Sequence, residues 1–105
     1  MKTIFIVRHS KSSWKNINIS DYDRPLNKRG KKDAEIMSIE LLKKNILIDF
    51  LLSSSSKRTI ITSKYFIDKI KINKYEFFDS LYHASSDKIY SSIIELKNEF
   101  NKVMI

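Results

Sequence analysis

The feature that most constrains the fold is a regular alternation between short apolar runs and longer stretches with helical spacing. The apolar runs are rich in β-branched and aromatic residues and predict buried strands. Strands are predicted over residues 2–7, 48–54 and 75–80, with a fourth beginning at 102, and helices over 28–44, 56–70 and 86–101. This alternation predicts a three-layer α/β/α domain with a mainly parallel sheet and right-handed crossovers.

Polar residues at the predicted helix starts mark the boundaries more sharply than the periodicity does. Asn27 is a plausible N-cap for the first helix, and Ser85 or Ser86 for the third. Gly30, the only glycine, falls in the first turn of its helix. Since glycine lowers helix stability, we expect it to permit a close backbone approach there.

Length and composition narrow the classes of protein. A chain of 105 residues with 42% hydrophobic residues forms one small globular domain over 1–105. No apolar stretch reaches the roughly 20 residues that cross a bilayer, so no membrane association is expected. The chain has no Cys, which excludes disulfides and thiolate metal sites, and a cytoplasmic location is expected.

The net charge of +8 raises the question of nucleic-acid binding. The lysines are interleaved with Glu and Asp along the predicted helices, which is typical of solvated faces, so no nucleic-acid partner is expected. The 16 Lys outnumber four Arg, which are Arg8, Arg24, Arg29 and Arg58. Where Lys is used so freely, an Arg marks a position that needs a planar guanidinium.

Three polar clusters follow the predicted strands. Arg8 and His9 follow the first, residues 53–58 end the second and begin its helix, and Asp79 to His83 follow the third. In a parallel sheet these clusters converge on one edge, where ligands bind. An imidazole there can attack phosphorus if its other ring nitrogen donates a hydrogen bond, while guanidinium groups hold the phosphoryl oxygens. Such a site needs no metal or other cofactor, and two histidines without paired carboxylates make a poor ligand set.

Four segments in order, "VRHSKSSW", "DYDRPLNKRG", "SSSSKRTIITS" and "DSLYHASS", resemble the histidine phosphatase superfamily, and most closely its SixA-type phosphohistidine phosphatases. The resemblance implies a phosphoglycerate mutase-like fold. It also implies that His9 is the phosphorylated nucleophile and that Arg8 and Arg58 bind the phosphoryl group. By the same resemblance Arg24 and Arg29 pack the loop before the first helix, which favours structural roles for them.

Other candidate site residues have two interpretations each. Ser10, Lys11 and Ser13 either reach phosphate oxygens or are exposed polar loop residues. His83 either binds substrate or has a local structural role, and the structural role is favoured. Asp79, or alternatively Glu76, is a possible proton donor to the leaving group.

The resemblance also implies a second pocket histidine in a loop directly after a strand like "KVMI", where this sequence ends. We therefore expect the domain to be truncated at its C-terminus. The predicted function is hydrolysis of a phosphoryl group through a phosphohistidine intermediate, on protein phosphohistidine. The alternatives are a small phosphomonoester as substrate, or a non-catalytic phosphate or phosphoprotein binder.

Overall fold

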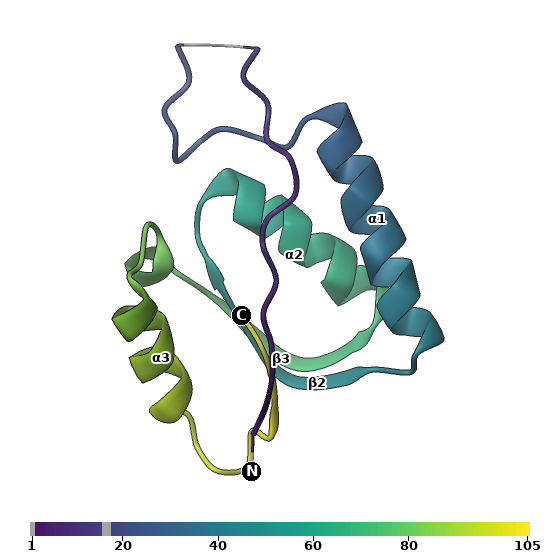
Figure 1. Ribbon diagram of the computed structural model, residues 1–105, viewed down its shortest axis with the longest axis vertical. Helices are drawn as coiled ribbons and strands as arrows, with labels where there is room; N and C mark the ends of the chain where they lie inside the picture. The colour runs from purple at the N-terminus through teal and green to yellow at the C-terminus, as the bar shows by residue number, and fades with distance from the viewer. Residues whose placement is uncertain (1, 16–17) are drawn as a thin grey trace.

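The computed structural model describes residues 2–15 and 18–105 of the chain (Figure 1). Strands and helices alternate as the sequence predicts, and a short 3-10 turn follows the third strand. In chain order the elements are β1 (Thr3–Phe5), α1 (Lys28–Lys43), β2 (Leu47–Ser54), α2 (Lys57–Lys69), β3 (Lys71–Phe78), the turn η1 (Asp79–Leu81), α3 (Ser86–Ile94) and β4 (Lys102–Met104).

The strands of the described residues form one sheet in the order β1-β4-β2-β3, and every pair is parallel. β2 lies between β3 and β4, and its whole length pairs with β3, from Leu47 opposite Lys71 to Ser54 opposite Phe78. Because all strands run in one direction, their carboxyl ends share one edge of the sheet. The loops that carry the predicted site residues therefore leave the sheet at the same edge.

Helices cover both faces of the sheet, α1 and α2 on one and α3 on the other (Figure 1). Successive residues of β2 alternate between the two faces, so Leu51 packs with Phe66 of α2, whereas Leu52 packs in the cluster that Ile89 of α3 contacts. In β4, Met104 packs on the side of α2, whereas Val103 packs on the side of α3. The predicted three-layer α/β/α architecture with a parallel sheet is confirmed.

The predicted helix caps and the predicted role of Gly30 are confirmed. The Asn27 side chain accepts a hydrogen bond from the Gly30 backbone nitrogen at 2.7 Å. Ser85, not Ser86, caps α3 by accepting from the Lys88 backbone nitrogen at 3.2 Å. Gly30 is buried, and a Cβ at this position would overlap the Lys11 carbonyl oxygen. A glycine is therefore needed where the loop after β1 crosses the start of α1.

Two strands differ from their predicted bounds. β1 is limited to Thr3–Phe5 rather than residues 2–7, although the Val7 backbone nitrogen still donates to the Ile105 carbonyl at 2.8 Å. β3 begins at Lys71 rather than at 75, because α2 ends at Lys69 and the next residue is already extended. β3 lies at the edge of the sheet and its burial pattern is largely exposed, so its first half lacks the apolar signal of a buried strand.

The third helix ends at Ile94 rather than at 101. The chain must turn to enter β4, and the Asp49 carboxylate accepts the backbone N–H groups of Asn101 and Lys102 at 3.0 and 2.9 Å. Apolar residues beyond the helix, Leu96 and Phe100, still pack against the core. The spacing of Leu96 and Phe100 therefore arises because both side chains reach the core from the turn after α3, and not because the helix continues.

The long loop between β1 and α1 is closed by backbone pairing at its base. Ser12 forms an antiparallel bridge with the buried Leu26. Beside it, the Ser13 backbone nitrogen donates to the Pro25 carbonyl at 2.8 Å, and that of Asn27 donates to the Lys11 carbonyl at 2.9 Å. This pairing holds residues 11–13 beside residues 25–27, next to the start of α1.

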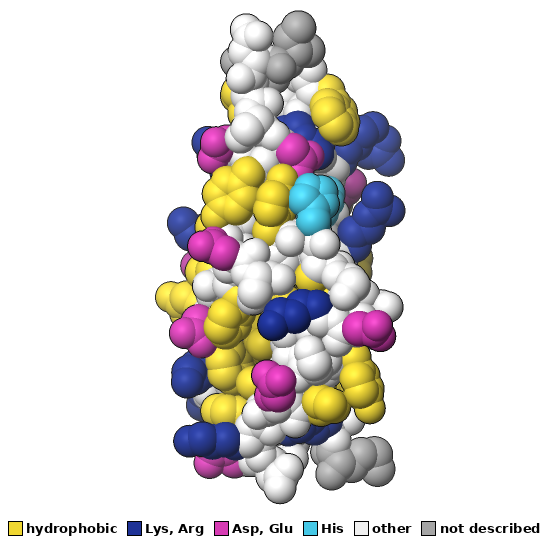
Figure 2. Space-filling view, turned by 90° about the vertical axis from the view of Figure 1, so that its left-hand side faces the viewer, with side chains coloured by type: hydrophobic (Ala, Val, Ile, Leu, Met, Phe, Trp, Pro, Cys, Tyr) yellow, Lys and Arg dark blue, Asp and Glu magenta, His cyan; other side chains and the backbone are white. Residues whose placement is uncertain are grey.

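On the face that carries α3, Lys and Arg side chains are interleaved with acidic and apolar ones and form no continuous patch (Figure 2). Among the described residues, no helix combines the length and apolar character that crossing a membrane requires.

Candidate active site

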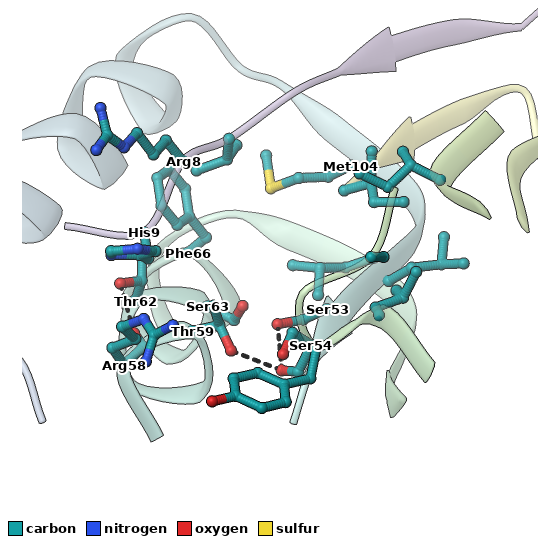
Figure 3. Close-up of a pocket in the computed structure, with 18 of the residues that line it drawn as sticks. Arg8, His9, Ser53, Ser54, Arg58, Thr59, Thr62, Ser63, Phe66 and Met104 are labelled. Carbon is teal, nitrogen blue, oxygen red and sulfur yellow. Dashed lines mark hydrogen bonds between the residues drawn. The ribbon is translucent and has the colours of Figure 1, made fainter. Parts of the chain in front are cut away.

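A cavity of about 310 Å³ opens where the predicted strands end (Figure 3). Arg8 and His9 follow β1, Ser53 and Ser54 end β2, and Arg58 begins α2. Tyr82 and His83, which follow η1 after β3, line the same cavity. The segments that follow the first three strands therefore converge, as the parallel sheet predicts.

His9 has a defined orientation and tautomer. Its Nδ1 lies 2.8 Å from the Ser10 carbonyl oxygen. Because a carbonyl oxygen only accepts, Nδ1 must carry the hydrogen of this bond. In the neutral imidazole the lone pair is then on Nε2, which is the arrangement that a nucleophilic histidine requires.

The loop that carries His9 is held on α2 by Thr62. The Thr62 Oγ1 accepts a hydrogen bond from the Ser10 backbone nitrogen at 3.1 Å and donates to the Arg58 carbonyl at 2.8 Å. Thr62 is buried. One hydroxyl thus joins the segment next to His9 to the first turns of the helix that carries Arg58.

Arg58 is buried, with a side chain only 9% exposed. Its Nη1 donates to the Asp21 carbonyl oxygen at 2.6 Å, and its Nη2 to the Asp21 Oδ2 at 3.1 Å. Its Nε is buried and has no hydrogen-bond partner among the described residues. Arg58 and His9 line the same cavity, and in Figure 3 they lie on the same side of it with Thr62 labelled between them.

Arg8 is oriented differently. It is exposed and lines the cavity, yet its guanidinium points away from His9 and Arg58 in Figure 3. The two predicted phosphate-binding arginines therefore do not face each other in this structure. Arg8 also lines a neighbouring hollow of about 500 Å³, together with His9, Lys11 and Arg24.

Arg24 lines that neighbouring hollow and also contacts other residues of the loop between β1 and α1. Its guanidinium stacks over the Trp14 ring, 3.8 Å from the centroid, donates to the Ser12 hydroxyl, and donates to the Asp21 Oδ1 at 2.8 Å. These contacts within the loop fit the structural role predicted for Arg24. Arg29 is exposed on α1, where its Nε lies 3.7 Å from the Asp33 Oδ2. It lines neither of the two hollows that contain His9.

The remaining predicted site residues are placed in three different ways. Ser10 and Lys11 line the neighbouring hollow, whereas Ser13 lines neither this hollow nor the main cavity and accepts a hydrogen bond from the Lys15 backbone nitrogen. His83 lines the main cavity with a side chain 66% exposed and a φ of 52°, an uncommon left-handed conformation for a residue other than glycine. Asp79 does not line the cavity and accepts hydrogen bonds from Ser55 and, at 3.3 Å, from the Tyr22 hydroxyl.

Asp21 is the polar residue at this site that sequence analysis missed. Its carboxylate accepts from the Tyr82 hydroxyl at 2.5 Å and also contacts Arg24, Arg58 and His83. The hydrogen bond from Tyr82, then those from the two arginines, holds the pKa of the Asp21 carboxyl well below its usual range. The same bond to Asp21 raises the pKa of the Tyr82 hydroxyl.

The sequence carries only a weak signal for these two residues. Asp21 lies in a polar segment rich in turn formers, where an aspartate is ordinary. Tyr82 lies in "LYHASS", a segment singled out for His83. In residues 2–15 and 18–105, no three His, Asp or Glu side chains are grouped as a metal ion would require.

The fold and the site define a class of three-layer α/β proteins with a histidine and a buried arginine at the carboxyl edge of a parallel sheet. Residues 4–92 match the model of the histidine phosphatase superfamily, branch 1, and the chain belongs to that superfamily.

Comparisons with individual proteins agree with this family. An uncharacterised chloroplastic protein of Arabidopsis thaliana is 36% identical over 60% of this chain and 29% of its own length. The 2,3-bisphosphoglycerate-dependent phosphoglycerate mutase of Buchnera aphidicola is 32% identical over 64% of this chain and 30% of its own. The structure of SixA from Agrobacterium tumefaciens superposes with a TM-score of 0.82 at 30% identity, over 96% of this chain and 65% of SixA. The chain thus spans about a third of these curated relatives and about two thirds of SixA.

Proposed function

We propose that this protein is a phosphatase that acts through a phosphohistidine intermediate on His9. The observation that carries the proposal is the hydrogen bond from His9 Nδ1 to the Ser10 carbonyl, which leaves the lone pair of the neutral ring on Nε2, in a cavity that the buried Arg58 also lines. Membership of the histidine phosphatase superfamily supports the same chemistry.

The reaction proceeds in two displacements. In the first, the Nε2 lone pair attacks phosphorus, the bond from phosphorus to the leaving group breaks, and its electron pair leaves with that group. In the second, a water oxygen attacks phosphorus, and the electron pair of the P–N bond returns to Nε2, which releases inorganic phosphate and one proton. Arg58 neutralises charge on the phosphoryl oxygens in both steps. Arg8 joins it after its exposed side chain rotates toward the cavity.

The likeness to SixA supports a phosphohistidine on a protein as the substrate. The leaving group is then an imidazole nitrogen, which needs less help from an acid than an alkoxide does. For a phosphomonoester substrate we assign proton donation to Asp79, whose carboxylate would have to leave Ser55 and turn toward the cavity. The mutase among the relatives favours such a small substrate as the second candidate.

The test is incubation with a ³²P-labelled phosphohistidine peptide. We expect an acid-labile label on His9 that turns over to inorganic phosphate. His9→Ala should lower hydrolysis by at least about a hundredfold, because the covalent route is then closed. Lys88→Ala on the exposed part of α3 is the matched control and should retain wild-type rates. Unchanged hydrolysis in His9→Ala would contradict the mechanism.

A non-catalytic phosphate binder is the alternative from another class. The orientation of Arg8 away from Arg58 favours it, because the complete clamp is not assembled in this structure. Saturable phosphate binding without any label on His9 would identify the protein as a binder. Label that forms and turns over would exclude that alternative.

A further inference from the structure

The Asp21 carboxylate is surrounded by groups of the kind that bind phosphoryl oxygens. Its oxygens lie 2.5 Å from the Tyr82 hydroxyl, 2.8 Å from Arg24 Nη2, and 3.1 Å from both Arg58 Nη2 and His83 Nε2. Two guanidinium groups, a hydroxyl and an imidazole thus converge on one carboxylate. Such a set can donate four or more hydrogen bonds to an anion.

These partners also belong to the hollows that contain His9. Arg58, Tyr82 and His83 line the main cavity together with His9, and Arg24 lines the neighbouring hollow together with His9. Asp21 itself lines neither hollow, but it bonds to Arg58 of the main cavity and to Arg24 of the neighbouring hollow. The chain's own carboxylate thus engages cationic groups that line the same hollows as the predicted nucleophile.

The charges of this set suit a dianion better than a carboxylate. Arg24 and Arg58 contribute two positive charges, and Asp21 compensates only one of them. A phosphoryl group carries up to two negative charges and three oxygens, so it can engage both guanidinium groups and the neutral donors together. Asp21 is ionised at neutral pH, as an ordinary aspartate is, and its partners lower the pKa of its carboxyl further.

We propose that Asp21 is an internal competitor of the phosphoryl group, and that Arg24, Tyr82 and His83 join Arg58 in binding the phosphoryl oxygens once Asp21 has turned away. This inference rests on the proposed function, because it places the phosphoryl group beside His9. The apparent affinity for phosphate is then the intrinsic affinity multiplied by the fraction of molecules in which Asp21 has turned away.

The local structure allows this exchange without unfolding the loop. The Asp21 side chain is 40% exposed, so it can rotate into solvent. Arg58 Nη1 is bonded to the Asp21 backbone carbonyl at 2.6 Å, which does not depend on the position of the carboxylate. The loop can therefore stay attached to Arg58 while Asp21 yields to the phosphoryl group.

The test compares the affinity for inorganic phosphate of the wild type, Asp21→Asn and Asp23→Asn by isothermal titration calorimetry at constant ionic strength. Asp23→Asn is the matched control, since it removes the same charge two residues away, where the carboxylate accepts only from Ser20 among the described residues. We expect Asp21→Asn to bind phosphate about tenfold more tightly, equal to ~1.4 kcal/mol, and Asp23→Asn to stay within about twofold of wild type. Unchanged or weaker binding by Asp21→Asn would overturn the proposal, because Asp21 would then only brace the arginines.

A measurement on the wild type covers the case in which Asp21→Asn fails to fold. Phosphate is titrated into ¹⁵N-labelled protein, with sodium chloride at matched ionic strength as the control. We expect the backbone amides of residues 20–24 and of Tyr82 and His83 to shift specifically with phosphate. No specific shift in these segments at saturating phosphate would overturn the proposal.

The inference and the proposed function fail in distinguishable ways. If Asp21→Asn binds phosphate more tightly while His9 is never labelled, the competitor role stands and the phosphatase proposal falls. If His9 is labelled and turns over while the two affinities are equal, the phosphatase proposal stands and Asp21 is no competitor.

Discussion

Thr62 shows how much of the site depends on a single hydroxyl. It is the one side chain that bonds both the backbone next to His9 and the backbone of Arg58, among the residues that the structure describes. Since both bonds are to backbone groups, Thr62 sets where the loop lies on α2 rather than where a side chain points. His9 depends on that position, because its own bond is to the Ser10 carbonyl.

Replacing Thr62 by the isosteric Val tests this role. The change leaves the Ser10 N–H without its partner, and we expect a loss of about 1–3 kcal/mol in the free energy of unfolding, measured in urea. Phosphohistidine hydrolysis should fall as well, because the imidazole is no longer held. Thr3→Val, the same change at an exposed position of β1, is the control and should be near neutral. A Thr62→Val protein with wild-type stability would show that this hydrogen bond contributes nothing.

Where the site residues lie in the fold was only partly predictable from the sequence. His9 and Arg58 follow apolar runs that predict strands, so their place at one sheet edge could be inferred from the sequence. The orientation of Arg8 could not, because the place of a residue in the chain does not fix the rotamer of a long exposed side chain. Asp21 was missed, since its partners Arg58 and Tyr82 lie 37 and 61 residues away.

At the level of secondary-structure elements, the crossing of α1 by the loop after β1 depends on Gly30. The loop backbone at Lys11 passes so close to the helix that no side chain fits. The pairing of Ser12 with Leu26 holds the loop in this position. α1 therefore supports the segment that follows Arg8 and His9, although it contributes no residue to the main cavity.

Gly30→Ala separates helix propensity from this packing. Propensity alone predicts that Ala stabilises a helix interior by about 1 kcal/mol. The new Cβ would instead displace the Lys11 carbonyl, and we expect a net loss of about 1–3 kcal/mol in thermal or urea unfolding, as in other overpacked sites. Lys32→Ala, an exposed position in the same helix, is the control. A more stable Gly30→Ala protein would mean that the loop moves away at no cost.

Element boundaries were predictable where local chemistry sets them. Asn27 and Ser85 bond backbone groups three residues ahead, so the starts of α1 and α3 could be predicted from sequence. The end of α3 could not, because the turn into β4 is held by Asp49, which lies on another strand. The start of β3 was missed because an edge strand needs no apolar alternation.

At the scale of the whole molecule, the Asp21 contacts join segments that are distant along the chain. One carboxylate connects the loop before α1 to Arg58 at the start of α2 and to Tyr82 and His83 after η1. These segments follow three different strands of the sheet. The contacts therefore hold these three segments together at the carboxyl edge of the sheet. The free energy of unfolding then depends on the ionisation of Asp21.

This link predicts a specific pH dependence. The pKa of Asp21 in the folded protein lies below the ordinary value of 3.8, so its contribution to stability is complete above about pH 4 and is lost as the pH falls toward the folded pKa. We expect the free energy of unfolding of the wild type to fall more steeply below about pH 4 than that of Asp21→Asn. The measurement is urea unfolding at a series of pH values.

Asp23→Asn again provides the comparison, because other carboxylates also titrate in this range. It should retain the steep wild-type dependence, since Asp23 bonds only Ser20 among the described residues. Parallel curves for the wild type and Asp21→Asn would show that the neighbours do not lower the pKa of Asp21 in the folded protein.

Alternating apolar runs and helical spacing were enough to predict the layers of the fold and the edge where His9 and Arg58 meet, because burial and strand direction depend on patterns that are local in the chain. Assembly of the sheet settled the rest: the insertion of β4 between β1 and β2, the turn of Arg8 away from Arg58, and the presence of Asp21 among the cations. The strand order and the Asp21 contacts join residues tens of positions apart, and such contacts leave no periodic trace in a single sequence.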